Sequence, residues 1–131
     1  MKSSAGQTLL ACAVMFSVLL TSVAAADLSG SWALEFQRSG SQEIYQGDCS
    51  FNQEGDRLSG SCIAGFESLV PVRGRVTGRS VTFDFTTRID SGSTLTFSGQ
   101  LDEQETSLKG TWRFVDPDGN KGDGTFTATK R

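Results

Sequence analysis

The sequence predicts an all-β protein: an eight-stranded antiparallel up-and-down (meander) barrel that follows a cleavable export signal. Three observations predict this fold class. Apolar and polar residues alternate through one segment after another, turn-forming residues separate the segments, and glycine recurs at a fixed phase within them. No helical periodicity is found after the first 26 residues, and a chain of 131 residues allows one domain.

The first 26 residues have the features of a signal peptide. Lys2 supplies a positive charge, an apolar run follows over 9–23, and three small residues close the segment at Ala26. The run is short for a membrane span and no stop-transfer pattern follows it. We therefore expect cleavage after Ala26, a mature domain of residues 27–131 without a transmembrane anchor, and a periplasmic or secreted location.

The cysteine count agrees with export. Cys12 leaves with the signal, so Cys49 and Cys62 remain, and an even remainder in an exported chain indicates a disulfide. A lipoprotein is an alternative, because residues 9–12 loosely resemble a lipobox, although the apolar run continues well past Cys12.

Charge and composition exclude several function classes. The chain has 12 Lys and Arg against 15 Asp and Glu, which argues against a nucleic-acid binder held by phosphate contacts. It has no histidine, so Ser-His-Asp and Cys-His nucleophile systems and His-ligated zinc are excluded. No carboxylate pair stands out either, since Glu35 and Asp84 fall on outward strand faces. We expect neither an enzyme nor a cofactor-dependent protein.

Eight segments read as strands, each bounded by a turn signal. In chain order they lie near residues 28–37, 43–53, 57–64, 68–77, 80–88, 93–101, 106–115 and 122–130. The turn signals between them are centred on 38–41, 55–56, 77–80, 90–92, 102–105 and 116–120. Alternation is clearest in the fifth segment, where Val81, Phe83 and Phe85 share one face, and it recurs in the sixth and seventh. Short connections favour antiparallel neighbours.

The second and third segments form a hairpin whose register can be predicted. If Gly55 and Asp56 make a two-residue primed turn, Glu54 faces Arg57, Phe51 faces Gly60, and Cys49 faces Cys62. That last pair falls at a non-hydrogen-bonded position, where the Cα atoms come closest and a cross-strand disulfide fits. The bridge should contribute about 3 kcal/mol to stability.

An apolar-x-Gly-x-apolar repeat places glycines at the same phase in most strands. Its members are Gly30, Gly60, Gly74, Gly99 and Gly110, with a weaker version at Gly124. We expect these six glycines on the inward face, where a missing Cβ lets a strand coil sharply or lets a ring lie over the backbone. Both devices help to close a barrel; an open sandwich with incidental glycines is the alternative.

The glycine-containing motifs, read in order, resemble those of the avidin/streptavidin family. They are Leu28-Ser29-Gly30-Ser31-Trp32, Leu58-Ser59-Gly60-Ser61, Val76-Thr77-Gly78-Arg79, Phe97-Ser98-Gly99-Gln100 and Gly124-Thr125-Phe126-Thr127. The resemblance covers nearly the whole mature chain and implies an avidin-like, lipocalin-like eight-stranded barrel. The residues through which that family contacts biotin are not carried over: their positions hold Leu34, Cys62, Ala64, Phe97 and Gly124, and only Trp112 matches. The resemblance therefore implies an architecture and argues against biotin.

The interior of such a barrel can be filled or can hold one small ligand. The candidate ligand-lining residues are the inward rings Trp32, Phe83, Phe85, Phe97, Trp112 and Phe126. They indicate either a site for a small apolar molecule or a solid aromatic core.

Two surface features were weighed as binding sites. The loop over 116–120 superficially resembles a calcium loop, but Lys121 stands where a glycine is needed, and Asp-Pro-Asp-Gly is also a good type I turn; we predict no metal. Arg73, Arg75, Arg79 and Arg88 gather around the fourth and fifth strands, as a solvated face or as an anion site.

Two function classes follow. The first is an exported small β-barrel binding module, whose ligand is an unknown small apolar molecule or a protein partner and whose oligomeric state is open. The second is a protease inhibitor: the export signal, the single disulfide and the start Leu28-Ser29-Gly30-Ser31-Trp32 are similar to the periplasmic inhibitors of serralysin-type metalloproteases. That resemblance implies an N-terminal arm that plugs the protease cleft. Only Asp27 would precede the motif after cleavage at Ala26, so a longer mature N-terminus would favour the inhibitor.

Overall fold

The computed structural model describes residues 26–64, 69–87 and 92–131. Residues 1–25 of the predicted signal segment 1–26, and Arg88, lie outside the described residues. All regular structure in the described part is β-strand. It includes no helix long and apolar enough to cross a membrane.

Eight strands follow one another along the chain. They are β1 (Gly30–Arg38), β2 (Ile44–Glu54), β3 (Arg57–Ala64), β4 (Val70–Thr77), β5 (Ser80–Thr86), β6 (Thr94–Leu101), β7 (Ser107–Val115) and β8 (Lys121–Lys130). Every boundary lies within two residues of the sequence-based expectation, because Gly, Asp or Ser follows most of the strands at the point where the alternation stops.

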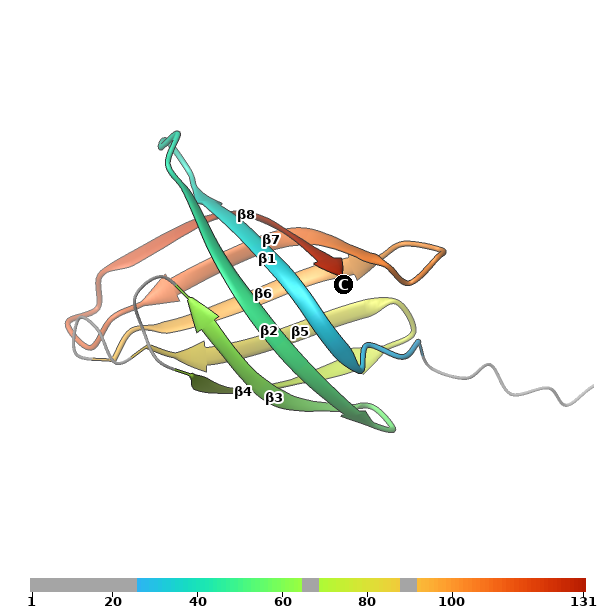
Figure 1. The fold of residues 1–131 in the computed structure, drawn as a ribbon. Coiled ribbons are helices and arrows are strands. Elements are labelled where there is room, and N and C mark those ends of the chain that lie inside the picture. Colours follow the sequence, from blue (N-terminus) through green and yellow to red (C-terminus); the bar gives the residue numbers. More distant parts are fainter. Residues whose placement is uncertain (1–25, 65–68, 88–91) are drawn as a thin grey trace, which may run out of the picture.

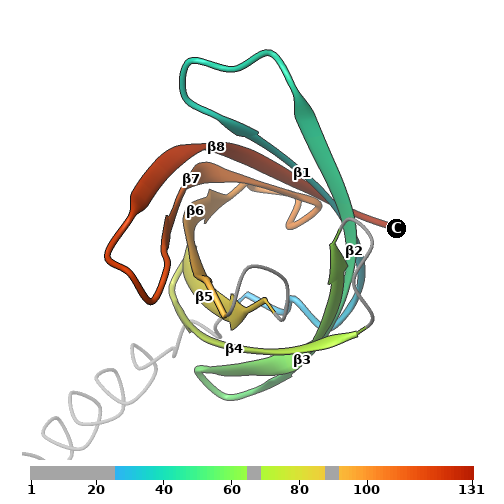
Figure 2. The ribbon, with the colours of Figure 1, turned by 90° about the vertical axis from the view of Figure 1, so that its left-hand side faces the viewer.

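The strands close into a barrel in sequence order. Each strand pairs antiparallel with the next, and β8 returns to β1 along a ladder from Trp32 opposite Lys130 to Arg38 opposite Gly124. Figure 1 shows the long, tilted strands, and Figure 2 shows the ring that they form. The predicted up-and-down barrel is confirmed, and the open-sandwich alternative is wrong.

Alternation within the strands decides which side chains fill the barrel. In β5, Val81, Phe83 and Phe85 are buried, whereas Thr82 and Thr86 are exposed. The same period of two continues around the ring, so that one cluster of buried apolar side chains occupies the interior.

The β2–β3 hairpin has the predicted register. Glu54 pairs with Arg57, Phe51 with Gly60, and Cys49 with Cys62. Gly55 supplies the positive φ, +62°, that a primed two-residue turn requires. The Cα atoms of the two cysteines are 4.1 Å apart and their sulfurs are bonded, so the predicted disulfide is confirmed.

Four of the six singled-out glycines pack against neighbouring groups inside the wall of the barrel. A Cβ on Gly74, Gly110 or Gly124 would overlap a backbone oxygen of the adjacent strand, and a Cβ on Gly99 would lie 2.9 Å from the Phe126 ring. These glycines are partly or fully buried. They allow both the sharp coiling and the ring-over-backbone packing that closure needs.

Gly30 and Gly60 correct the expectation that all six glycines face inward, because both are exposed. Their φ angles, +126° and +143°, interrupt the regular pleat, so phase in the sequence no longer fixes the face of the sheet. At Gly60 a Cβ would still overlap the carbonyl oxygen of Ser50, whereas Gly30 has only the Lys130 side chain nearby.

One rim of the barrel carries the β2–β3, β4–β5 and β6–β7 turns. Backbone bonds tie each turn to a neighbouring strand: Val76 N–H donates to Asp56 O (2.9 Å), Leu101 N–H to Arg79 O (2.8 Å) and Lys130 N–H to Thr106 O (2.9 Å). Both β1 and the C-terminal end of β8 also meet this rim, on the right of Figure 1. The rim is therefore hydrogen-bonded well beyond the strand ladders.

Candidate functional site

The six candidate ligand-lining rings come together inside the barrel. Trp32 comes from β1, Phe83 and Phe85 from β5, and the others from β6, β7 and β8. The six side chains are between 0% and 5% exposed. Sequence reasoning therefore identified a set of residues that share one space.

These rings contact one another. The ring of Phe97 stacks on those of Phe83 and Phe85, with centroids 4.9 Å and 5.6 Å away, and it meets the ring of Phe126 edge-on at 5.2 Å. Phe51 continues the contacts toward the rim that carries the β2–β3 turn, since its ring lies 5.3 Å from that of Phe83 and 6.4 Å from that of Trp32. Such separations are those of directly packed aromatic pairs. The rings thus take up the space that a ligand among them would need.

The polar atoms of the interior are already partnered. Trp32 Nε1–H donates to Leu28 O at 2.8 Å, and Trp112 Nε1–H donates to Gln37 O at 3.1 Å. Among the described residues, no buried side-chain nitrogen or oxygen lacks a partner. A ligand site usually offers a few unpaired polar groups that fix orientation, and the described interior offers none.

The N-terminal segment closes one rim of the barrel. The Gln53 amide holds it at two points: Nε2 donates to Ala26 O (2.7 Å), and Oε1 accepts from Leu28 N–H (2.8 Å). Asp27 N–H donates to Glu105 Oε1 at 2.9 Å, and the Leu28 side chain is completely buried. Residues 26–29 are therefore fastened to the barrel.

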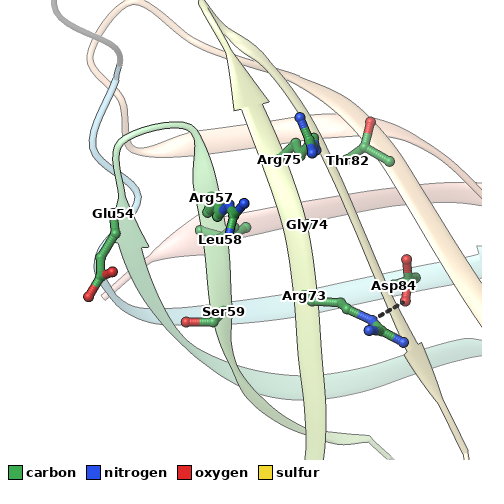
Figure 3. Close-up of a pocket in the computed structure, with 9 residues that line it drawn as sticks. All are labelled: Glu54, Arg57, Leu58, Ser59, Arg73, Gly74, Arg75, Thr82 and Asp84. Carbon is green, nitrogen blue, oxygen red and sulfur yellow. Dashed lines mark ion pairs between the residues drawn. The ribbon is translucent and has the colours of Figure 1, made fainter.

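A hollow of about 620 Å³ lies on the outside of the barrel, over β3, β4 and β5 (Figure 3). It is lined by Glu54, Arg57, Leu58, Ser59, Arg73, Gly74, Arg75, Thr82 and Asp84. Arg57 comes from β3, whereas Arg73 and Arg75 come from β4. The barrel thus gathers three guanidinium groups at one place on an acidic protein.

The charges in this hollow are incompletely compensated. Arg73 Nε lies 4.0 Å from Asp84 Oδ1, with the two side chains 88% and 41% exposed. Arg75 Nη1 lies 3.7 Å from Asp56 Oδ2, with exposures of 72% and 63%. Exposed pairs at these distances are weak.

Sequence reasoning found only part of this cluster. It grouped Arg73 and Arg75 with Arg79 and Arg88, their neighbours in the chain. Arg79 does not line the hollow; it stands in the β4–β5 turn. Arg57 was missed, and the signal that could have found it is the β3–β4 register, which sets Arg57 directly opposite Arg75.

A second outer hollow, of about 540 Å³, differs in its chemistry. Hydroxyl groups from β6, β7 and β8 surround it, among them Ser98, Thr111 and Thr125. It contains one cation, Arg113, and one carboxylate, Asp123, which face each other across the strands. The Arg57–Arg73–Arg75 hollow is thus the more strongly cationic of the two.

The calcium-like loop uses its carboxylate to build a turn. Asp116 Oδ1 accepts from Asn120 N–H at 2.7 Å, and Oδ2 accepts from Asn120 Nδ2 at 2.8 Å. These bonds, the side-chain one above all, lower the pKa of Asp116. Both carboxylate oxygens of Asp116 are therefore bonded to Asn120, one to its backbone and one to its side chain.

The two outward carboxylates considered for catalysis stay apart and exposed. Glu35 Oε1 accepts from Gln46 Nε2 at 3.3 Å on the β1–β2 face. Asp84 lies on β5 beside Arg73. The structure does not bring them together.

No known protein family matches the chain, and no curated protein matches it at a significant level.

Proposed function

We propose that the protein is an exported binding module that acts through the outer surface of its barrel. The observation that carries this proposal is the packing of the interior rings: five of the six candidates contact one another around Phe97, Trp32 is joined to them through Phe51, and each of the six is no more than 5% exposed. A barrel filled in this way leaves its outer face to make contacts. The hollow over β3–β5 is the best candidate there, because it combines a volume of about 620 Å³ with incompletely paired charge.

The proposal of export rests on three features. The chain starts with a segment patterned as a signal peptide. The domain has a disulfide between Cys49 and Cys62, and such bonds persist in oxidising compartments. The rim hydrogen bonds of Asp27 and Leu28 also suit a domain that starts near Asp27. We place the protein in the periplasm or outside the cell.

We propose a resemblance to avidin in the architecture alone. Of the positions at which that family contacts biotin, Leu34 is buried within the apolar core and Cys62 is bonded to Cys49. Phe97 lies at the centre of the packed rings. These residues support a filled interior.

The protease-inhibitor alternative receives no support from the described residues. An inhibitory arm must leave the barrel to enter a cleft. Here Leu28 N–H is bonded to Gln53 Oε1, Asp27 N–H is bonded to Glu105 Oε1, and Leu28 is buried. Mass spectrometry of the exported protein tests this alternative: we expect a mature chain that starts at Asp27, and several additional residues would instead favour the inhibitor.

The filled interior can be tested with a panel of small apolar molecules such as benzene and indole. We expect no change in the Tm of the wild-type protein. Phe97→Ala is the positive control, because removing the central ring should open a dry cavity that takes up a small apolar molecule and raises the Tm. If Phe97→Ala does not fold, Phe97→Leu opens a smaller cavity by the same reasoning. A saturable rise in the wild-type Tm would refute the proposal.

A further inference from the structure

We propose that the Arg57–Arg73–Arg75 hollow is a carboxylate-binding site that takes a short acidic segment of a partner protein in extended conformation. This inference rests on the proposed outer-surface function and names its partner class. It is carried by the arrangement of the three arginines, by the shape of the hollow and by the charges around it.

The first observation is that Arg57 and Arg75 are directly paired across β3 and β4. Both side chains project from the outer face of the sheet (Figure 3). Like charges directly opposite each other on neighbouring strands destabilise a sheet. Of the described residues, none forms an ion pair with Arg57. Folding therefore brings together two cations that a bound anion would stabilise.

The second observation is that the three arginines of the hollow keep most of their hydrogen-bonding capacity. Each guanidinium group has five N–H donors, and one contact to a carboxylate uses at most two of them. Arg73 and Arg75 each make a single long contact, at 4.0 Å and 3.7 Å. A carboxylate between the strands could therefore receive two parallel bonds from one guanidinium without breaking an existing short pair.

The third observation is the shape of the hollow. It runs across the end of β2 and then β3, β4 and β5, which at normal strand spacing is roughly 14 Å, the length of about four extended residues. The hydroxyl groups of Ser59 and Thr82 lie along it and can bond to a peptide backbone. Gly74 contributes backbone to its floor, between the outward side chains of Arg73 and Arg75.

The charges around the hollow favour a short acidic segment over a long polyanion. Glu54 and Asp84 border the three arginines, and the whole chain has a formal charge of −3. A polyphosphate or a nucleic acid would extend beyond the cationic spot onto repulsive surface. One or two carboxylates fit inside it.

The experiment measures binding of fluorescein-labelled peptides by polarisation at low ionic strength. The probe has two glutamates at alternate positions of an extended four-residue segment between glycines, so that both carboxylates fall on one face, and its control has glutamines in their place. We expect saturable binding of the glutamate peptide alone, weakened by added salt. Arg57→Gln and Arg75→Gln should each weaken binding about tenfold or more, since each removes a charged hydrogen-bond partner. Arg113→Gln, on the outer face of β7, is the matched control and should leave the affinity within about twofold.

Folding can be separated from binding in these variants. Because Arg57→Gln relieves repulsion with Arg75, its Tm should be no lower than that of the wild type. If a variant loses binding but has a Tm at or above that of the wild type, the loss is therefore caused by removal of the arginine from the site and not by unfolding.

Three results would overturn the proposal. One is the absence of saturable binding, another is an equal loss of affinity in Arg113→Gln, and the third is tighter binding of inorganic polyphosphate than of the glutamate peptide. None of them touches the question of the interior. A wild-type Tm raised by an apolar molecule would instead overturn the proposed outer-surface function, whatever the peptides do.

Discussion

The indole Nε1–H of Trp32 donates a 2.8 Å hydrogen bond to the carbonyl oxygen of Leu28 inside the barrel. The N–H of Leu28 is bonded to Gln53 Oε1, so both backbone groups of this completely buried residue are satisfied by side chains. The chain can therefore enter the barrel rim just ahead of β1 without leaving a polar group unpaired.

Replacing Trp32 with Phe should test this bond. The variant leaves the buried Leu28 carbonyl without a donor, which we expect to lower the free energy of unfolding by about 1–3 kcal/mol beyond the loss of ring volume. Trp112→Phe is the matched control, because its partner, the carbonyl oxygen of Gln37, is only part-buried and water can replace the bond. Urea titration of both variants measures the difference. Equal losses of unfolding free energy in the two variants would mean that the bond to Leu28 stabilises the protein no more than the bond to Gln37 does.

Reduction of the Cys49–Cys62 bridge should destabilise the barrel by about 3 kcal/mol, because the bridge restricts the unfolded chain. Both cysteines are buried, so reductant will act through the unfolded state. Urea midpoints with and without reductant measure the effect. The double variant Cys49→Ala, Cys62→Ala should be less stable than the wild type and indifferent to reductant, and a reductant effect on that variant would point to another cause.

Alanine substitutions at two glycines should separate rigid from adaptable contacts. A Cβ on Gly110 would overlap the Ser98 carbonyl oxygen, whereas a Cβ on Gly122 would meet the partly buried ring of Phe114. Backbone within a closed ladder cannot move aside, but a ring near solvent can rotate. We expect Gly110→Ala to lower the Tm far more than Gly122→Ala, or to prevent folding. Thermal melts of the two variants decide the order, and a reversed order would contradict the explanation.

Stability should fall in acid partly through Asp102. Hydrogen bonds, first of all from the Thr106 N–H, hold the pKa of this carboxyl below its usual 3.8. The stabilisation that these hydrogen bonds give to the ionised carboxylate is therefore fully present at pH values above its usual pKa. It is lost as the pH falls through the lower pKa of the folded state. Asp102→Asn should lower the Tm near neutral pH. On acidification, the Tm of this variant should fall less than that of the wild type. Glu103→Gln, in the same turn, is the control and should follow the wild-type pH profile.

Much of the fold could be predicted because strand alternation and turn chemistry are local. The β2–β3 register followed from one two-residue turn, and the Cys49–Cys62 pair agreed with it. The interior rings followed from the same period of two. By contrast, Gly30 and Gly60 have positive φ angles that a repeat of residue types does not reveal, so their faces were not predictable.

The outer hollow needed information that the chain order does not contain. Arg57 lies opposite Arg75 only because β3 and β4 pair in a particular register, and the connection between them is longer than a tight turn. Glu105 is a second example. It is the only non-glycine with positive φ among the described residues. The sequence around Glu105 does not predict that its carboxylate accepts a hydrogen bond from the Asp27 N–H.

The seam between β1 and β8 has a mechanical consequence. The two strands are antiparallel neighbours and their outer ends share a rim, so tension applied between Ala26 and Arg131 loads the hydrogen bonds of this ladder one after another rather than all at once. The barrel should thus open at a low pulling force, because the hydrogen bonds of this ladder break in sequence. The length of the extended chain after opening would be shorter by the segment that the disulfide closes between Cys49 and Cys62, which are 13 residues apart in sequence.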